Sequence, residues 1–206
     1  MTRLRLIVLL ICLAAGAAAQ DYFDYGGTMG IYFSPTEFTD AYTNLETPPP
    51  VFDLYIVLLD AQVDPLGGYE CGFQATDPQV FWLTATGPSG WLNFGSTNNH
   101  IAGYQNPLPA PPGGVVLSTV TALYVLSDPV DIFMGPSDPS SGDPNNNPFG
   151  LSWDGPIIGG YENPDILLVC HLTSGAAGYP DVVATLNTIP VAVEEESWTQ
   201  IRDLFD

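Results

Sequence analysis

Hydrophobic and polar positions alternate along much of this chain with the two-residue period of β-strands. In the clearest case three apolar residues alternate with small or polar ones: Tyr69, Cys71 and Phe73 against Glu70, Gly72 and Gln74. This pattern predicts a strand with one face in a core. Residues 51–59, before the turn at 64–68, form a nearly continuous apolar run that predicts a strand buried on both faces.

Further short apolar runs predict strands along most of the chain. They lie at residues 28–33, 80–85, 91–94, 100–104, 115–126, 131–134, 165–172 and 181–186. Turns rich in Gly, Pro, Asn and Asp separate them, and no long helical period intervenes between them. The sequence therefore predicts an all-β, immunoglobulin-like sandwich of about 8–9 strands over residues 20–190.

The first nineteen residues predict a signal peptide. Arg3 and Arg5 precede an apolar run at 6–15, and the alanines at 17–19 form a small-residue cleavage site before Gln20. The run is shorter than the roughly 20 residues that span a bilayer, although an uncleaved anchor is the alternative. We therefore expect a protein that is secreted or that resides in the periplasm or at the cell surface.

Residues 191–206 predict a linker and a short amphipathic helix. Trp198, Ile201 and Phe205 recur at helical spacing, and Ser197 and Gln200 form a capping-box pattern. Such a short helix is marginally stable alone. It either packs on the sandwich or docks on another protein.

Two motifs in residues 51–134 carry a family resemblance. The segment GYECGF at 68–73 and the turn TDP at 76–78, followed by Val80, resemble the cohesin-like family of secreted β-sandwiches. That family shares its architecture with many carbohydrate-binding modules. The resemblance implies the fold, whereas no motif matches the family's partner-binding face. As a whole, the chain resembles secreted bacterial proteins built from a signal peptide, one sandwich and a short tail that contains tryptophan.

Charge narrows the possible partners. The chain has 23 Asp and Glu residues but only 3 Lys and Arg, for a formal net charge of −20. All three basic residues are arginines, and two of them lie in the predicted signal peptide. Binding to nucleic acids, phosphate groups or anionic membranes requires several Lys or Arg side chains, and only Arg202 would remain after cleavage of the signal peptide. Solubility in a salty medium and divalent-cation binding both remain possible reasons for the acidity.

Calcium is the candidate cofactor. The oxygen donors that we expect to bind it are Asp138, Asp143, Asn145 and Asp154, with Asn146 and Asn147 beside them. They lie in a Pro- and Gly-rich stretch, and calcium prefers oxygen ligands on irregular backbone. The spacing matches no EF-hand. The alternative is a solvated loop rich in Asx turns.

Aromatic residues suggest a platform for sugar rings. The candidates are Trp91, Trp153, Tyr104 and Tyr161. Trp82 lies in the middle of a predicted strand, and we expect it in the core. Ordinary packing is the alternative for all of these side chains, because aromatics dominate the cores of β-sandwiches.

Cys71 and Cys170 remain after signal cleavage. They form either one disulfide, which an oxidising compartment would favour, or two separate core thiols. His100 and His171 are too few for a convincing zinc site. No nucleophile–base pair is recognisable, and Ser89 matches no nucleophile elbow.

These observations predict a non-catalytic module for adhesion, scaffolding or protein interaction at the cell surface. The alternative is a carbohydrate-binding module, stabilised by calcium in one version. The expected partner is thus a protein or a polysaccharide.

Overall fold

The computed structural model describes residues 26–45, 51–141, 155–164, 167–174 and 180–187. These residues form thirteen β-strands, and none of them lies in a helix. The strands are β1 (Thr28–Tyr32), β2 (Tyr42–Thr43), β3 (Val51–Leu59), β4 (Leu66–Ala75), β5 (Val80–Thr86), β6 (Trp91–Asn93), β7 (Asn99–Leu108), β8 (Val115–Tyr124), β9 (Val130–Gly135), β10 (Ile157–Gly160), β11 (Leu167–Val169), β12 (His171–Leu172) and β13 (Asp181–Leu186). The predicted all-β class is confirmed, with more strands than expected.

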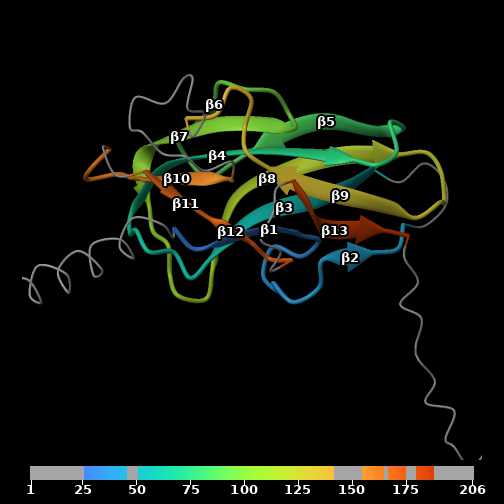
Figure 1. Cartoon of the computed structure of the whole chain (residues 1–206), viewed down its shortest axis with the longest axis horizontal. Helices are drawn as coiled ribbons and strands as arrows, with labels where there is room; N and C mark the ends of the chain where they lie inside the picture. Colours follow the sequence, from blue (N-terminus) through green and yellow to red (C-terminus); the bar gives the residue numbers. More distant parts are fainter. Residues whose placement is uncertain (1–25, 46–50, 142–154, 165–166, 175–179, 188–206) are drawn as a thin grey trace, which may run out of the picture.

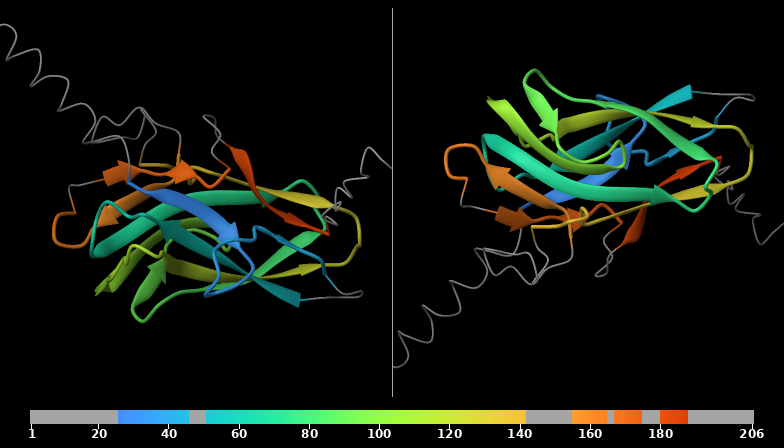
Figure 2. Two further views of the ribbon diagram at one scale, coloured as in Figure 1. Left: turned by 90° about the horizontal axis from the view of Figure 1, so that it is seen from below. Right: turned by 90° about the horizontal axis from the view of Figure 1, so that it is seen from above.

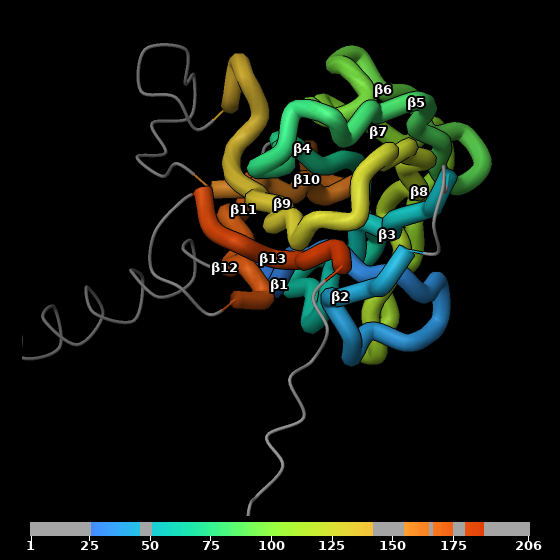
Figure 3. Tube along the Cα trace, turned by 90° about the vertical axis from the view of Figure 1, so that its right-hand side faces the viewer, coloured from blue at the N-terminus to red at the C-terminus, as the bar shows by residue number. Residues whose placement is uncertain are grey.

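The strands form two sheets, which Figures 1 and 2 show as two layers. The five-stranded sheet has the order β12-β1-β3-β8-β5, and the eight-stranded sheet has the order β11-β10-β4-β9-β13-β2 with β7 and β6 added beside β4. Two pairs are parallel, β1 with β12 and β13 with β2, and the others are antiparallel. Figure 3 shows the end of the molecule where β13 and β2 lie side by side.

β4 is the central strand of the larger sheet. β7 pairs with one of its edges, while β10 and β9 share the other, β10 along Leu66–Glu70 and β9 along Gly72–Ala75. The chain segment that joins β9 to β10 therefore begins and ends beside the middle of β4. This fork puts both ends of that segment at one edge of β4, between Glu70 and Gly72.

One hydrophobic core fills the space between the sheets. On β4, Tyr69, Cys71 and Phe73 are buried in it. Glu70, Gly72 and Gln74 alternate with them on the opposite face, as the sequence predicts. Trp82 packs against the core at its edge, with its ring perpendicular to that of Phe73 at 5.1 Å.

Three strand predictions differ from the structure. β3 is buried on both faces only near Val57, and its first residues alternate between exposed and buried. Residues 165–172 do not form one strand, because the chain leaves the larger sheet after β11 and joins the smaller one at β12. β10 is a strand where the sequence predicts none, because its IIGG sequence lacks a strand pattern.

Both ends of the chain lie outside the described residues. The predicted signal peptide at 1–19 and the predicted helix within 191–206 are therefore not seen. No helix long and apolar enough to span a membrane occurs within the described ranges.

Candidate functional site

A buried polar cluster joins the two sheets. The Tyr69 hydroxyl on β4 donates to Ser118 Oγ on β8 at 2.7 Å, and it lies 2.8 Å from His100 Nδ1 on β7. Ser118 Oγ lies 3.3 Å from the same ring nitrogen. Tyr69 is 2% exposed, and His100 and Ser118 are fully buried. Ser118 and His100 lie on different sheets, so their contact links the two layers. Because both are buried, no substrate can reach Ser118, and the two residues are not an accessible nucleophile–base pair.

Burial determines the charge of His100. Desolvation lowers its pKa to about 4, because the apolar surroundings disfavour the imidazolium. Nε2 lies 3.2 Å from the Thr97 carbonyl, so Nε2 carries the proton and Nδ1 accepts. The rings of Phe73 and Trp91 pack edge-on against the imidazole at 5.4 and 5.7 Å. His100 is therefore a neutral core residue at physiological pH.

The two cysteines are core thiols in the structure. Both are fully buried, and burial raises the pKa of each. The registers of β10 with β4 and β11, continued by one residue, place Pro156 between Cys71 and Cys170, and the Cys170 amide donates to the Pro156 carbonyl. Two strand spacings amount to about 10 Å. Disulfides need Cα atoms within about 7 Å, so this register opposes the predicted bridge.

Three residues of the predicted aromatic platform are described, Tyr104, Trp91 and Tyr161, and they do not share one exposed surface. Tyr104 is 6% exposed, stacks on Tyr69 in the core and donates to the Leu117 carbonyl. Trp91 is partly buried against the same core. Tyr161 is 41% exposed on the outer face of the larger sheet, and Trp153 lies outside the described residues. Tyr104 and Trp91 face the core because they belong to the inner face of β7 and its neighbour β6, so their ring faces are not available to a sugar.

A short segment, residues 136–141, crosses the outer face of β4 and is called the strap here. The Pro136 carbonyl would lie 2.6 Å from a Cβ atom at Gly72, so only glycine admits this crossing without displacement. Asn99 on β7 holds Asp138 through two hydrogen bonds of 2.8 Å, accepting from its amide and donating to its carbonyl. The Glu70 carboxylate accepts from the Ser137 hydroxyl and from both the amide and hydroxyl of Ser141. These bonds fix the strap on the sheet.

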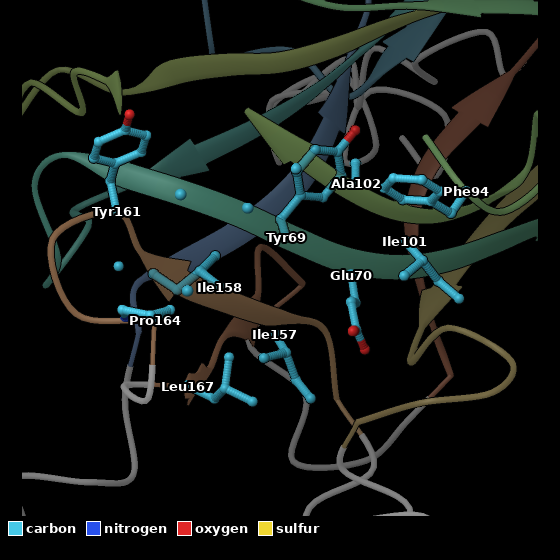
Figure 4. A pocket seen from close by; sticks show the side chains of 15 residues that line it. Tyr69, Glu70, Phe94, Ile101, Ala102, Ile157, Ile158, Tyr161, Pro164 and Leu167 are labelled. Atoms are coloured by element: carbon cyan, nitrogen blue, oxygen red, sulfur yellow. The ribbon is translucent and has the colours of Figure 1, made fainter. Parts of the chain in front are cut away.

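A first hollow, the apolar trough, lies on one side of the strap. Gly68 on β4 pairs with Gly103 on β7 and with Gly159 on β10, so three glycines in register form its floor. Its volume is about 400 Å³. Figure 4 shows Tyr161 and Pro164 at one end and Phe94 and Ile101 at the other.

The walls of the trough are mostly apolar. Ile101 and Ile157 flank Glu70 in register along one wall. Phe94 is 79% exposed, the largest exposed fraction among the large apolar side chains of the described residues. The Tyr161 hydroxyl donates to the Gln105 carbonyl at 3.3 Å, and this bond holds the Tyr161 ring in place on the opposite side of the trough. The trough is thus a preformed apolar site on an otherwise acidic surface.

A second hollow, the amide pocket, lies on the other side of the strap. Its volume is about 500 Å³. The residues that define it are Gly72, Gln74, Asn99, Phe133, Asp138 and Pro180. Gln74 and Phe133 are paired neighbours on β4 and β9, and both point away from the core. This pocket combines one aromatic ring with amide and carboxylate groups.

Calcium binding stays a prediction. Of the expected ligands only Asp138 is described, and it lies on the exposed side of the strap. Asp143, Asn145 and Asp154 lie outside the described residues, as do Asn146 and Asn147. Within the described ranges, no three His, Cys, Asp or Glu side chains gather closely enough to hold a metal ion.

Sequence reasoning missed most of the residues that shape the two hollows, although its candidates Tyr161 and Asp138 are among them. Glycines in strand interiors signal a bulge or a close backbone approach, and β4 and β10 carry Gly67-Gly68 and Gly159-Gly160. That signal was present, but the register that aligns Gly68 with Gly103 and Gly159 depends on tertiary pairing. Phe133 and Gln74 carried no signal at all.

Comparison of the chain with protein-family models, with curated proteins and with solved structures finds no match in any of the three.

Proposed function

We propose that this protein is a non-catalytic, secreted β-sandwich module of immunoglobulin-like or cohesin-like architecture. In this proposal it serves adhesion or scaffolding at the cell surface by holding a partner protein in the apolar trough. The observation that carries the proposal is the floor of three aligned glycines, Gly68, Gly103 and Gly159, beneath apolar walls. Two sheets around one core support the sandwich assignment.

The chemistry of the trough favours an apolar side chain as its occupant. The backbone groups of the floor belong to the strand ladders, so few of them remain to bind a ligand. The two polar side chains are already engaged, Glu70 by Ser137 and Ser141 and Tyr161 by Gln105. A sugar hydroxyl or a phosphate would find few partners there, whereas a leucine or an aromatic ring gains burial.

Charge favours a basic partner. The described residues include no lysine or arginine, so their ionised surface groups are carboxylates. Glu70 lies in one wall of the trough, and Glu162 is an exposed residue that follows Tyr161 in the sequence. Opposite charge steers association and favours a partner with Lys or Arg next to its apolar anchor. The occupant that we propose is therefore a protein segment that combines an apolar anchor with basic residues.

Filling the trough tests the proposal. A Cβ atom at Gly103 would have no neighbour closer than 3.8 Å, so Gly103→Leu places a side chain in the trough without a backbone clash. Gly113→Leu is the matched control, because Gly113 is exposed in a turn with no atom within 4 Å. We expect the wild type and Gly113→Leu to remain at the surface of the producing cells during washing at low salt. Gly103→Leu should appear in the medium at low salt. An unchanged distribution of Gly103→Leu would contradict the proposal.

A further inference from the structure

We propose that the amide pocket is a second binding site, separate from the trough, and that it takes a neutral or amino-bearing pyranose ring. The ring belongs to a polysaccharide or to a glycan on a protein, since both present the same chemistry. The inference does not depend on the protein docking proposed above, because the strap lies between the two hollows and their defining side chains differ.

Phe133 supplies the apolar surface. On β9 it points outward between the buried residues Ile132 and Met134, and it is only partly covered. Its ring therefore lies on the solvent side of the sheet. Packing in the core does not require an aromatic residue at this position. A pyranose has a face of C–H groups that packs on such a ring, which is how aromatic side chains bind partly polar ligands.

Gln74 and Asp138 supply the polar groups. Gln74 lies directly opposite Phe133 in the register of β4 and β9 and is exposed. Its amide offers two donors and one acceptor, which matches neighbouring hydroxyls on a sugar ring. Asp138 adds acceptor oxygens from the strap. The combination of one apolar wall and a few convergent polar groups is typical of small-ligand sites.

The pocket is held open before a ligand arrives. Asn99 fixes the backbone of Asp138, and Asn98 donates to the Phe73 carbonyl at 3.1 Å. These bonds hold the strap against Asn99 and the β6–β7 connection against the end of β4. A fixed pocket reduces the ordering cost of binding.

Charge selects among sugars. Asp138, which carries a carboxylate, lines the pocket, and the described residues offer no lysine or arginine to pair with an anion. Uronic acids and sulfated sugars should therefore be rejected, whereas neutral hexoses and amino sugars are accepted. The volume of about 500 Å³ accommodates more than one ring, so oligomers should bind more tightly than single sugars.

The test is an NMR titration of the full mature chain. The probes are the methyl glycosides of glucose, galactose, mannose and glucosamine, with cellohexaose and chitohexaose as oligomers and methyl glucuronide as the anionic control. We expect saturable shift changes at the Gln74 side-chain amide and at the Gly72 and Gly135 backbone amides. Methyl glucuronide should produce none.

Matched variants make the result specific. Gln74→Ala and Phe133→Leu should each weaken binding at least ten-fold with melting temperatures near that of the wild type. Gln105→Ala and Phe94→Leu change exposed residues at the trough and should leave binding unchanged. The proposal is overturned if no probe gives saturable shifts at the pocket, if Gln74→Ala binds as the wild type does, or if methyl glucuronide binds equally well.

Discussion

Gly68 on β4 lies directly opposite Gly103 on β7, on the outer face of the eight-stranded sheet. Their side of the sheet carries no Cβ atoms, and Gly159 extends this bare strip onto β10. Glycine weakens a strand, so three aligned glycines carry a stability cost that an ordinary surface would avoid. The register of β4, β7 and β10 therefore creates the floor of the trough.

Gly72, beneath the strap, and Gly103, in the floor of the trough, should respond differently to substitution. Gly72→Ala would place a Cβ 2.6 Å from the Pro136 carbonyl, which forces the strap to move, so we expect a loss of about 1–3 kcal/mol in the free energy of unfolding. Gly103→Ala meets no atom closer than 3.8 Å and should change that free energy by less than about 0.5 kcal/mol. Urea unfolding of the two variants measures both. Equal effects would show that the strap does not press on Gly72.

The Tyr69 hydroxyl should contribute measurably to stability. Tyr69→Phe removes a group that contacts both Ser118 and His100 in the core, and buried polar atoms that lose a partner cost about 1–3 kcal/mol. Tyr42→Phe is the control, because Tyr42 is 43% exposed, and it should change little. Denaturant unfolding at neutral pH compares them. A loss in Tyr69→Phe no larger than that in Tyr42→Phe would contradict the cluster's role.

The free energy of unfolding should decrease as the pH is lowered, because of His100. Its pKa is lowered from 6.5 to about 4 in the folded state, so the unfolded chain takes up the proton first as pH drops. The contribution is fully present above pH 6.5 and is lost towards pH 4, by up to about 3 kcal/mol. Urea unfolding at several pH values measures the slope.

Two histidine variants separate this effect from the titration of the carboxylates. His100→Asn should lack the His100 part of the slope, whereas His171→Asn, at an exposed position, should keep it. Identical pH profiles for the wild type and His100→Asn would exclude His100 as the cause.

The two core cysteines should be reactive thiols once the protein unfolds. Because the register sets Cys71 and Cys170 about two strand spacings apart, the mature protein purified without reductant should yield two titratable thiols in denaturant. It should yield almost none when folded, since both side chains are fully buried. A count of zero in denaturant would indicate a disulfide and a different local geometry.

Local patterns predicted the strands well where one face is apolar. Tyr69, Cys71 and Phe73 are inward as their alternation requires, and most predicted runs are strands. The inner face of β7 was harder to identify, because the polar His100 points inward while Ile101 points outward. The hydrogen bonds of His100, at Nδ1 with the Tyr69 and Ser118 hydroxyls and at Nε2 with the Thr97 carbonyl, make that arrangement favourable.

The candidate sites depend on contacts that are remote in sequence. Gly68, Gly103 and Gly159 meet through pairings that span 35 to 91 residues, and a single sequence carries no register information over such separations. Strand β10 has too little β pattern to be recognised, yet it completes the trough. Of the predicted sugar-platform residues that the structure describes, Tyr161 alone lines either of the two hollows.

The most direct measurement is photo-crosslinking from the trough itself. Phe94→benzoylphenylalanine places the reactive group at the most exposed wall, and Phe81→benzoylphenylalanine, 49% exposed on the other sheet, is the control. The account predicts that position 94 links one discrete protein through a peptide that contains Lys or Arg. It also predicts that Gly103→Leu abolishes this product, whereas Gly113→Leu does not. A product formed equally from position 81, or unchanged by Gly103→Leu, would contradict docking in the trough.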